Sequence, residues 1–363
     1  MDSLRCNFTP YLNCRKPCKT AVQFSPYLIN FIPLTHSSVL SSSSSSFSST
    51  CKFSSKRLFN SSSQNHRLRK VLSAMVSEES ATGSGSVSSL SDGFKLTYLE
   101  GNSWLWEVGG LKLLVDPILV GNLDFGIPWL YDAAKKFLKN FQLTDIPDVD
   151  CLLITQSLDD HCHMKTLKPL SEKFPNLRVV ATPNAQANLD PLFSKVTYLE
   201  PGQNTEVEGR NGSKVGIRAT AGPILGPPWQ RPENGYIVSS SECQSTLYYE
   251  PHCVYNEGSL KEEQADIVIT PVIKQLLPNF TLVSGQDDAV KLAKLLCAKF
   301  VVSMNNGDLE SKGLLASIIQ RVGTIESFKE LLSKELPNAK VLEPIPGVAL
   351  EIPAVELSEH EIL

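Results

Sequence analysis

Short runs of apolar residues separated by turns run through most of this chain. The run Cys151–Ile154 is apolar at every position, which is typical of a strand buried on both faces. Three earlier runs, KLTYLEG, SWLWEVGG and LKLLVDP, contain glycines that predict turns between three short strands. The third run ends at Asp116-Pro117, where the proline cannot donate a hydrogen bond to a sheet.

Segments with helical periodicity alternate with further strands in the rest of the chain. Helices are predicted over 131–141, 164–174, 185–193, 286–297 and 325–336. Strands are predicted over 177–181, 195–199, 206–208, 214–220, 235–239, 245–250, 265–270, 299–304, 341–342 and 348–352. Each half begins with strands and continues with helix–strand units. This order predicts an α/β fold in which two sheets pack face to face with helices outside.

The first 92 residues differ from the rest in composition. Residues 1–75 are rich in serine and contain ten of the 34 Lys/Arg residues but only one acidic residue, Asp2. Such a segment cannot bury a core and is typical of an organelle transit peptide, and its serine content favours the plastid. We therefore expect a disordered transit peptide over 1–75 and chloroplast localisation. The alternative is an ordinary disordered tail.

The remaining chain is expected to form a flexible linker over 76–92, a single folded domain over 93–353 and an acidic tail over 354–363. After residue 75 the chain has 24 Lys/Arg and 37 acidic residues, a formal net charge of −13. This charge disfavours nucleic-acid binding, and no apolar run approaches the ~20 residues of a membrane span. Five cysteines follow residue 75 without CxxC spacing, so we expect buried free thiols rather than disulfides.

Chemically active side chains concentrate where the apolar run Cys151–Ile154 ends. The run is followed by QSLDDHCH, which contains two carboxylates, two imidazoles and a thiol. The histidines of the predicted domain are His161, His163 and His252, and each follows a buried strand beside a carboxylate. Such residues at strand ends are typical of a metal site or an acid–base site.

A simpler interpretation of the same stretch is structural. Asp159 or Asp160 could cap the helix predicted over 164–174, which would leave a solvated loop. Cys162 and Cys253 each flank a histidine, but alternation along the chain points them to the opposite side. A nucleophilic role is therefore not expected for either thiol.

Several of these motifs resemble, in the same order, the metallo-β-lactamase fold in its lactonase-like branch. TYLEGNSWLWEVGGLKLLVDP is similar to the opening of that family, and VDCLLITQSLDDHCH is similar to its strand and THxHxDH motif. NGYIV, TLYYEPH, ADIVITPV and DDAVKLAKLLCAKFVVSMNNGD resemble its later elements, so the resemblance covers 94–353. It implies an αββα sandwich of two mixed sheets with outer helices. The metal site would lie at one edge, between the sheets.

The resemblance also indicates which metal ligands of the family this chain lacks. The family's first two histidines fall on Gln156 and Leu158, and no histidine lies near Gly222-Pro223-Ile224, where a third is expected. The first of the family's two metal positions has therefore lost its histidines. The resemblance implies a degenerate motif that excludes the usual two-metal centre.

The second metal position keeps most of its ligands. The family's aspartate and next histidine fall on Asp160 and His161, its bridging aspartate on His252 and its last histidine on Asn305. A catalytic zinc site needs about three strong protein ligands. The resemblance implies one divalent metal, zinc first and Mn or Fe as alternatives, bound by Asp160, His161 and His252. Asn305 would be a weak ligand, and His163 a fourth ligand or a hydrogen-bonding neighbour.

Residues around this position are assigned further roles. Asp159 or Glu250 would act as general base toward a metal-activated water. In the proline-rich loop 223–233, Trp229 would hold an aromatic ring of the substrate and Arg231 an anionic group. The alternative is that this loop is a structural lid packed on the core.

Three functions are consistent with these assignments. The first is a metal-dependent hydrolase of the plastid with a reduced, single-metal site, acting on a small molecule. The second is a non-catalytic binding or regulatory protein that retains the fold without metal. The third is an iron protein with redox or oxygen chemistry, because two histidines and one carboxylate can form a facial triad. Asp116 is expected only to orient its neighbours, and the oligomeric state has no signature in the sequence.

Overall fold

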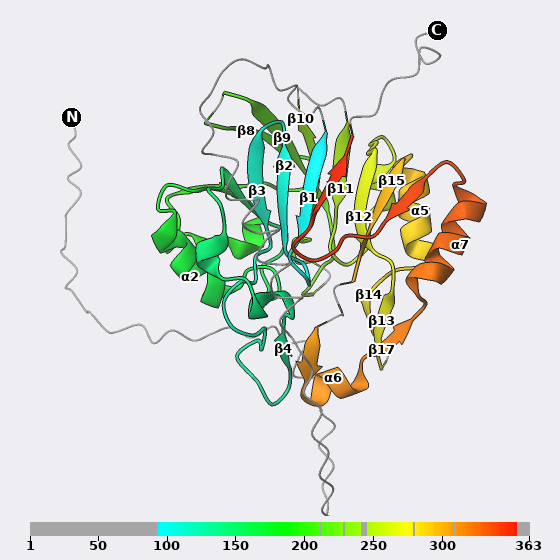
Figure 1. Ribbon diagram of the computed structural model, residues 1–363, viewed down its shortest axis with the longest axis horizontal. Helices are drawn as coiled ribbons and strands as arrows, with labels where there is room; N and C mark the ends of the chain where they lie inside the picture. The colour runs from blue at the N-terminus through cyan, green and yellow to red at the C-terminus, as the bar shows by residue number, and fades with distance from the viewer. Residues whose placement is uncertain are drawn as a thin grey trace, which may run out of the picture.

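The computed structural model shows two seven-stranded sheets packed face to face, with helices on both outer sides (Figure 1). It describes residues 93–353 except 211, 228, 241–244, 279, 306 and 308. The predicted transit peptide, linker and acidic tail lie outside the described residues. The predicted α/β architecture, an αββα sandwich of two mixed sheets, is confirmed.

The first sheet contains the apolar run that follows the opening strands. Its order is β19-β1-β2-β3-β5-β6-β7. The strands are β1 (Phe94–Tyr98), β2 (Trp104–Val108), β3 (Leu111–Val115), β5 (Cys151–Ile154), β6 (Arg178–Ala181), β7 (Lys195–Tyr198) and β19 (Ala349–Ile352). β19, β1, β2 and β3 pair antiparallel, whereas β3, β5, β6 and β7 pair parallel. Since β3 and β5 are parallel neighbours, the residues that follow them emerge at the same edge.

The second sheet mirrors this arrangement. Its order is β18-β15-β12-β11-β10-β9-β8. The strands are β8 (Asn204–Glu208), β9 (Lys214–Ala221), β10 (Asn234–Ser240), β11 (Thr246–Tyr249), β12 (Ile267–Pro271), β15 (Phe300–Met304) and β18 (Lys340–Leu342). β11, β12, β15 and β18 are parallel, so their carboxyl ends also share one edge.

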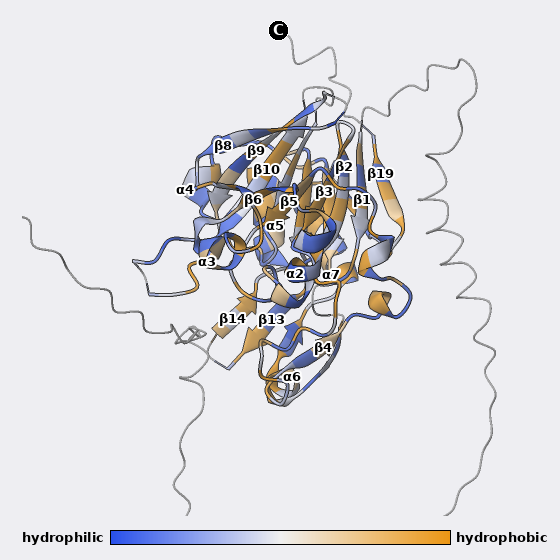
Figure 2. Cartoon of the chain, turned by 90° about the vertical axis from the view of Figure 1, so that its left-hand side faces the viewer, coloured by the Kyte–Doolittle hydropathy of each residue, from blue (hydrophilic) through white to orange (hydrophobic). Residues whose placement is uncertain are grey.

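The apolar side chains of each strand divide between the inner and outer faces of its sheet. From β5, Cys151 and Leu153 face the second sheet, whereas Leu152 and Ile154 face outwards. All four are fully buried, and burial of one leucine contributes roughly 2 kcal/mol to stability. Between the sheets, the ring of Trp106 meets that of Tyr249 edge to face at 5.3 Å. In Figure 2, β3 and β5 are accordingly hydrophobic along most of their length.

Three longer helices cover the outer faces (Figure 1). α2 (Met164–Lys173) packs on the first sheet, and α5 (Asp287–Leu295) and α7 (Ile325–Glu335) pack on the second. α7 begins at a capping box, in which the Thr324 side chain accepts a hydrogen bond from the Ser327 backbone. The shorter helical turns are η1 (Phe137–Lys139), η2 (Leu143–Asp145), η3 (Pro183–Ala185), α3 (Gln186–Leu189), α4 (Glu257–Leu260) and α6 (Leu314–Ile318).

A small extension grows from the carboxyl ends of β3, β12 and β15 and lies at the bottom of Figure 1. It contains the sheets β14-β13-β17 and β16-β4. Their strands are β4 (Asp132–Ala134), β13 (Lys274–Leu277), β14 (Phe280–Val283), β16 (Glu310–Lys312) and β17 (Gln320–Val322). The prediction of a helix over 131–141 was wrong. Ala133 exchanges backbone hydrogen bonds with Leu123, and β4 pairs with β16, so tertiary pairing overrides the local periodicity.

Of the five cysteines predicted to be buried free thiols, Cys243 lies outside the described residues and the other four can be compared with the structure. Cys151, Cys162 and Cys253 are buried free thiols, whereas Cys297 is exposed. The expectation of burial was wrong for Cys297, which lies in a left-handed turn after α5 with φ 55°. Across the described residues, no helix has the length and apolar character needed to cross a membrane.

Candidate metal centre

Strand ends from both sheets bring the polar side chains together. In the first sheet, β3 is followed by Asp116 and β5 by Thr155, and these two residues are hydrogen-bonded neighbours. In the second sheet, β11 is followed by Glu250, with His252 two residues further on. Because the sheets pack face to face, these strand ends meet at one edge of the sandwich.

Asp160, His161 and His252 form a group of three potential metal ligands. One ligand atom from each residue lies within 4.8 Å of the other two. The Nε2 atom of His161 lies 3.1 Å from Asp160 Oδ2, and the Nε2 atom of His252 lies 3.9 Å from the same oxygen. The structure thus places side by side the three residues that the sequence predicted as strong ligands.

A carboxylate behind His161 fixes the orientation of its ring. Nδ1 of His161 lies 2.8 Å from Asp116 Oδ2. Asp116 is itself held by Thr155, whose backbone N–H donates to Oδ1 at 2.8 Å and whose hydroxyl donates to Oδ2. With Nδ1 directed at Asp116, the Nε2 atom faces Asp160, which is the arrangement usual for metal-binding histidines.

Burial and mutual charge set the protonation of the group. Burial alone lowers the pKa of His161, but the carboxylates of Asp160 and Asp116 outweigh it and raise this pKa to about 10. Burial raises the pKa of Asp160, but the charge of His161 dominates and lowers it to about 2. Burial and the charge of His161 lower the pKa of His252 to about 4, so this ring is neutral at pH 7. The charged form of His161 therefore occupies the space between two carboxylates, where a divalent cation could replace its proton.

A buried amide and a buried carboxylate hold His252. Gln156 Nε2 lies 2.8 Å from His252 Nδ1 and 3.4 Å from Glu250 Oε1. Glu250 is fully buried, and its Oε2 accepts hydrogen bonds from the backbone N–H groups of His252 and Val254. Burial raises the pKa of Glu250 to about 8. Glu250 thus supports the turn that carries His252.

Two buried oxygen atoms fit the presence of a cation in this group. Asp160 Oδ1 and Gln156 Oε1 are buried and have no hydrogen-bond partner among the described residues. Buried polar atoms are nearly always paired, so an unpaired carboxylate oxygen beside two imidazoles is suited to a metal. Rotating the Gln156 amide by about 180° would let Oε1 accept a hydrogen bond from His252 Nδ1–H, which leaves the Nε2 atom of His252 for the metal. Two nitrogens and a carboxylate oxygen suit zinc or iron.

His163 lies outside the group of three. Its ring is fully buried, and Nδ1 lies 2.9 Å from Thr166 Oγ1. The same hydroxyl accepts hydrogen bonds from the backbones of Leu119 and Val120. Burial lowers the pKa of His163 to about 4. These contacts join the start of α2 to the segment after β3, and the role of His163 as a ligand or neighbour stays a prediction.

Asp159 is the carboxylate of this turn that is most open to solvent. Its side chain is 26% exposed, and its Oδ2 lies 3.9 Å from His163 Nε2. Burial raises the pKa of Asp159, against the effect of a hydrogen bond from the Met164 backbone N–H. His163, rather than Asp159 or Asp160, is the N-cap residue of α2. No aspartate occupies the N-cap position, but Asp159 accepts the N–H of Met164, the first residue of α2, which is the contact that the simpler interpretation expected from one of the two aspartates.

Three other residues, Asn305, Trp229 and Arg231, were predicted to belong to the site. Asn305 is half-buried and directly follows β15, at the edge where β12 also ends. Trp229 is 86% exposed, and Arg231 forms an ion pair with Glu200 at 3.1 Å. Among the described residues, no hydrogen bond or ion pair joins these three side chains to the group. Their assigned roles stay predictions.

Asn102 and Thr155 belong to the site but were not predicted from the sequence. The Nδ2 atom of Asn102 lies 3.1 Å from His161 Nε2 and donates to the Asp160 carbonyl at 3.3 Å. Asn102 sits in the turn between β1 and β2, inside the opening motif, and Thr155 directly follows the buried strand β5. A polar residue at a turn or strand end beside the histidine motif is the signal that could have identified both.

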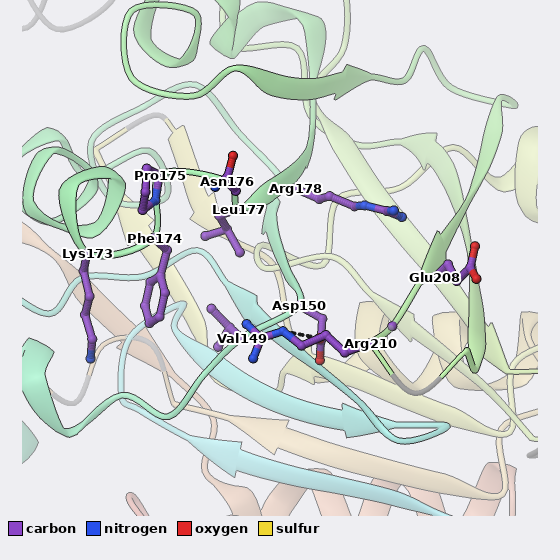
Figure 3. A pocket seen from close by; sticks show the side chains of 11 residues that line it. Val149, Asp150, Lys173, Phe174, Pro175, Asn176, Leu177, Arg178, Glu208 and Arg210 are labelled. Atoms are coloured by element: carbon purple, nitrogen blue, oxygen red, sulfur yellow. Dashed lines mark ion pairs between the residues drawn. The ribbon is translucent and has the colours of Figure 1, made fainter.

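The cavity shown in Figure 3 lies away from this group. It has a volume of about 420 Å³, and its lining includes Asp150, Arg178 and Arg210. Asp150 directly precedes β5 and Arg178 begins β6, whereas Asp160 and His161 of the group follow the end of β5. The cavity and the group therefore lie at opposite edges of the first sheet.

Comparisons with known proteins agree with the fold. A family model described as "Beta-lactamase superfamily domain" matches residues 95–305. The metallo hydrolase Igni18 from the archaeon Ignicoccus hospitalis is 17% identical with a TM-score of 0.48, over 71% of this chain and 98% of that one. The diiron beta-hydroxylase CmlA from Streptomyces venezuelae is 16% identical with a TM-score of 0.50, over 72% and 54%. The isothiocyanate hydrolase from Delia radicum gut bacteria is 19% identical with a TM-score of 0.49, over 72% and 100%. No curated protein sequence matches, and likeness at these identities shows the fold alone.

Proposed function

Because the chain belongs to the metallo-β-lactamase superfamily, we propose that it is a hydrolase that binds one divalent metal through Asp160, His161 and His252. The observation that carries this proposal is the convergence of the three ligand atoms within 4.8 Å, beside an unpaired Asp160 oxygen. Zinc is the first candidate, and Mn and Fe are the alternatives. The substrate would be a small molecule.

When bound, the metal supplies Lewis-acid activation of water. The chain's own residues would position and deprotonate the reactants. Asp116 holds His161 so that its Nε2 faces the metal position. Gln156 and Glu250 hold His252 from behind. Asp159 is the better candidate for general base, because it is partly open to solvent whereas Glu250 is fully buried.

A single metal is supported by what replaces the missing histidines. Gln156 occupies the position of the family's first histidine, and its side chain is bonded to His252. Leu158 has no atom that can bind a metal. The first of the family's two metal positions therefore lacks ligands here.

The second candidate function is a metal-free binding or regulatory protein. One observation favours it: a protonated His161 lies between Asp116 and Asp160, so its positive charge already offsets one of the two carboxylate charges. Such a group could persist as a buried ion network that only stabilises the edge of the sandwich.

Metal analysis of the purified full-length chain separates the two functions. We expect about one equivalent of metal after expression in medium containing Zn²⁺, Mn²⁺ and Fe²⁺. That metal should be lost when His161→Ala and His252→Ala are combined. No bound metal, together with no change in melting temperature on addition of any of the three ions, would rule out the hydrolase. In the metal-loaded protein, Asp159→Asn should abolish hydrolysis in a panel of esters, lactones and phosphodiesters while metal content is kept.

We further propose that the protein acts in the plastid, on the basis of the serine-rich, basic composition of 1–75. A fluorescent protein fused behind Met1–Met75 should enter isolated chloroplasts and be shortened there. Import of the same fusion into mitochondria alone would contradict this localisation.

A further inference from the structure

Lys135 is a buried lysine that directly follows β4. Its side chain is only 3% exposed, and a cation removed from water needs strong partners. Its Nζ donates a hydrogen bond to Ser103 Oγ at 2.6 Å. Burial lowers the pKa of Lys135 to about 7, against the raising effect of the Glu100 and Asp116 carboxylates. The amine can donate to Ser103 whether or not it is protonated.

The hydroxyl of Ser103 uses all of its hydrogen-bonding capacity. It accepts from Lys135 Nζ at 2.6 Å and from the Ile118 backbone N–H at 2.9 Å. It donates to the Asp116 carbonyl oxygen at 2.7 Å. A hydroxyl has one proton and two lone pairs, so with both lone pairs occupied its proton is directed at Asp116. Lys135 thereby fixes the direction in which Ser103 donates.

Asp116 needs this support because its backbone is in an unfavourable conformation. Its φ is 41°, in the left-handed region that residues other than glycine rarely adopt. In this conformation its carboxylate reaches Thr155 and the Nδ1 atom of His161. Buried hydrogen bonds therefore link Lys135 to Ser103 and Ser103 to the backbone carbonyl of Asp116. The carboxylate of the same Asp116 is in turn bonded to His161.

The turn that Lys135 contacts also places a second side chain beside His161. Asn102, next to Ser103, places its amide 3.1 Å from His161 Nε2. A Cβ atom added at Gly101 would lie 3.4 Å from the Cε atom of Lys135, so the lysine packs closely under this turn. The same turn therefore influences both nitrogens of the imidazole.

We propose that Lys135 is a positioning residue of the metal centre, which acts through Ser103 and Asp116 to aim His161 at the metal. This inference rests on the proposed function, because the aim of Nε2 matters only if it binds a cation. It adds a residue from the extension, outside both main sheets, to the machinery of the site.

The test measures Zn²⁺ affinity of the full-length chain by competition with a chromophoric chelator. Lys135→Met keeps the apolar stem and removes the donor, and Ser103→Ala removes the hydroxyl. Each should weaken Zn²⁺ binding about tenfold, the lower end of what loss of an outer partner costs a metal site. The double variant should bind no more weakly than Ser103→Ala alone, because the lysine acts through that hydroxyl. The visible spectrum of the Co²⁺-loaded protein should change in both single variants.

The matched control is Lys139→Met, since Lys139 is 59% exposed and pairs with Glu310 at the surface. It should bind Zn²⁺ as the wild type does. Wild-type affinity and an unchanged Co²⁺ spectrum in Lys135→Met, or fully additive losses in the double variant, would overturn the inference. If Lys135→Met does not fold, the Zn²⁺ affinity and the Co²⁺ spectrum of Ser103→Ala test the inference by the same criteria. A wild-type chain that binds no metal overturns the proposed function and this inference with it. A metal-binding wild type with unaffected variants overturns the inference alone.

Discussion

Nδ1 of His161 lies 2.8 Å from Oδ2 of Asp116, although the two residues are 45 positions apart in the chain. Both are fully buried, and the Thr155 hydroxyl contacts the same oxygen. The pair determines which imidazole nitrogen points toward Asp160 and His252. Through this contact, residues of the first sheet orient the candidate ligand His161 toward His252 of the second sheet.

Asp116→Asn tests this contact with almost no change in volume. Without the carboxylate, the Nδ1 proton of His161 loses its charged acceptor, and we expect Zn²⁺ affinity to fall 10- to 100-fold. Chelator competition measures the affinity. Asp148→Asn, which alters an exposed aspartate paired with Arg210, should leave it unchanged. Equal affinity in the two variants would show that Asp116 does not support the metal.

His252 and His163 should respond differently to substitution. Saturating Zn²⁺ should raise the melting temperature of the wild type, because a ligand at ~100 times its Kd adds about 2.7 kcal/mol of stability. His252→Gln should abolish this shift. His163→Gln should lower the melting temperature, through its lost contact with Thr166, but should retain the shift. Loss of the Zn²⁺ shift in His163→Gln would instead make His163 a ligand.

Glu250 should make the metal-free protein less stable as the pH rises. Its pKa is about 8 in the folded chain, against 4.5 ordinarily. Between these values the unfolded chain releases a proton that the folded chain keeps, so the free energy of unfolding falls by up to about 1.4 kcal/mol per pH unit. Urea denaturation from pH 5 to 8 should show a smaller fall in Glu250→Gln. Glu208→Gln, at an exposed position, should behave as the wild type, and the same slope in all three proteins would refute the assignment.

The loop 223–233 offers a test between a substrate-binding and a structural role. Trp229 is 86% exposed, so Trp229→Ala should change the free energy of unfolding by less than about 0.5 kcal/mol. Arg231→Ala should have a similarly small effect, because its ion pair with Glu200 is on the surface. Chemical denaturation measures both. A loss well above 1 kcal/mol in either variant would favour the structural lid.

The layered fold could be predicted because the buried faces of strands and helices require apolar residues at regular spacing in the sequence. β5 was recognisable from four apolar positions, and the convergence of His161 and His252 followed from their places after strand ends. The burial of Lys135 leaves no such trace, because a lysine is ordinarily exposed. Ala133 was assigned to a helix because its pairing with β16 depends on residues far away in the chain. The contact between Gln156 and His252 was hidden for the same reason.

The positions of the ligands also constrain when a metal can bind. Asp160 and His161 follow β5 of the first sheet, and His252 follows β11 of the second. Neither sheet alone supplies three ligands, so tight binding must wait until the two halves of the chain have docked. If the chain is imported into the plastid as proposed, it would cross the envelope unfolded and therefore without metal. Its metal would have to come from the compartment in which it folds.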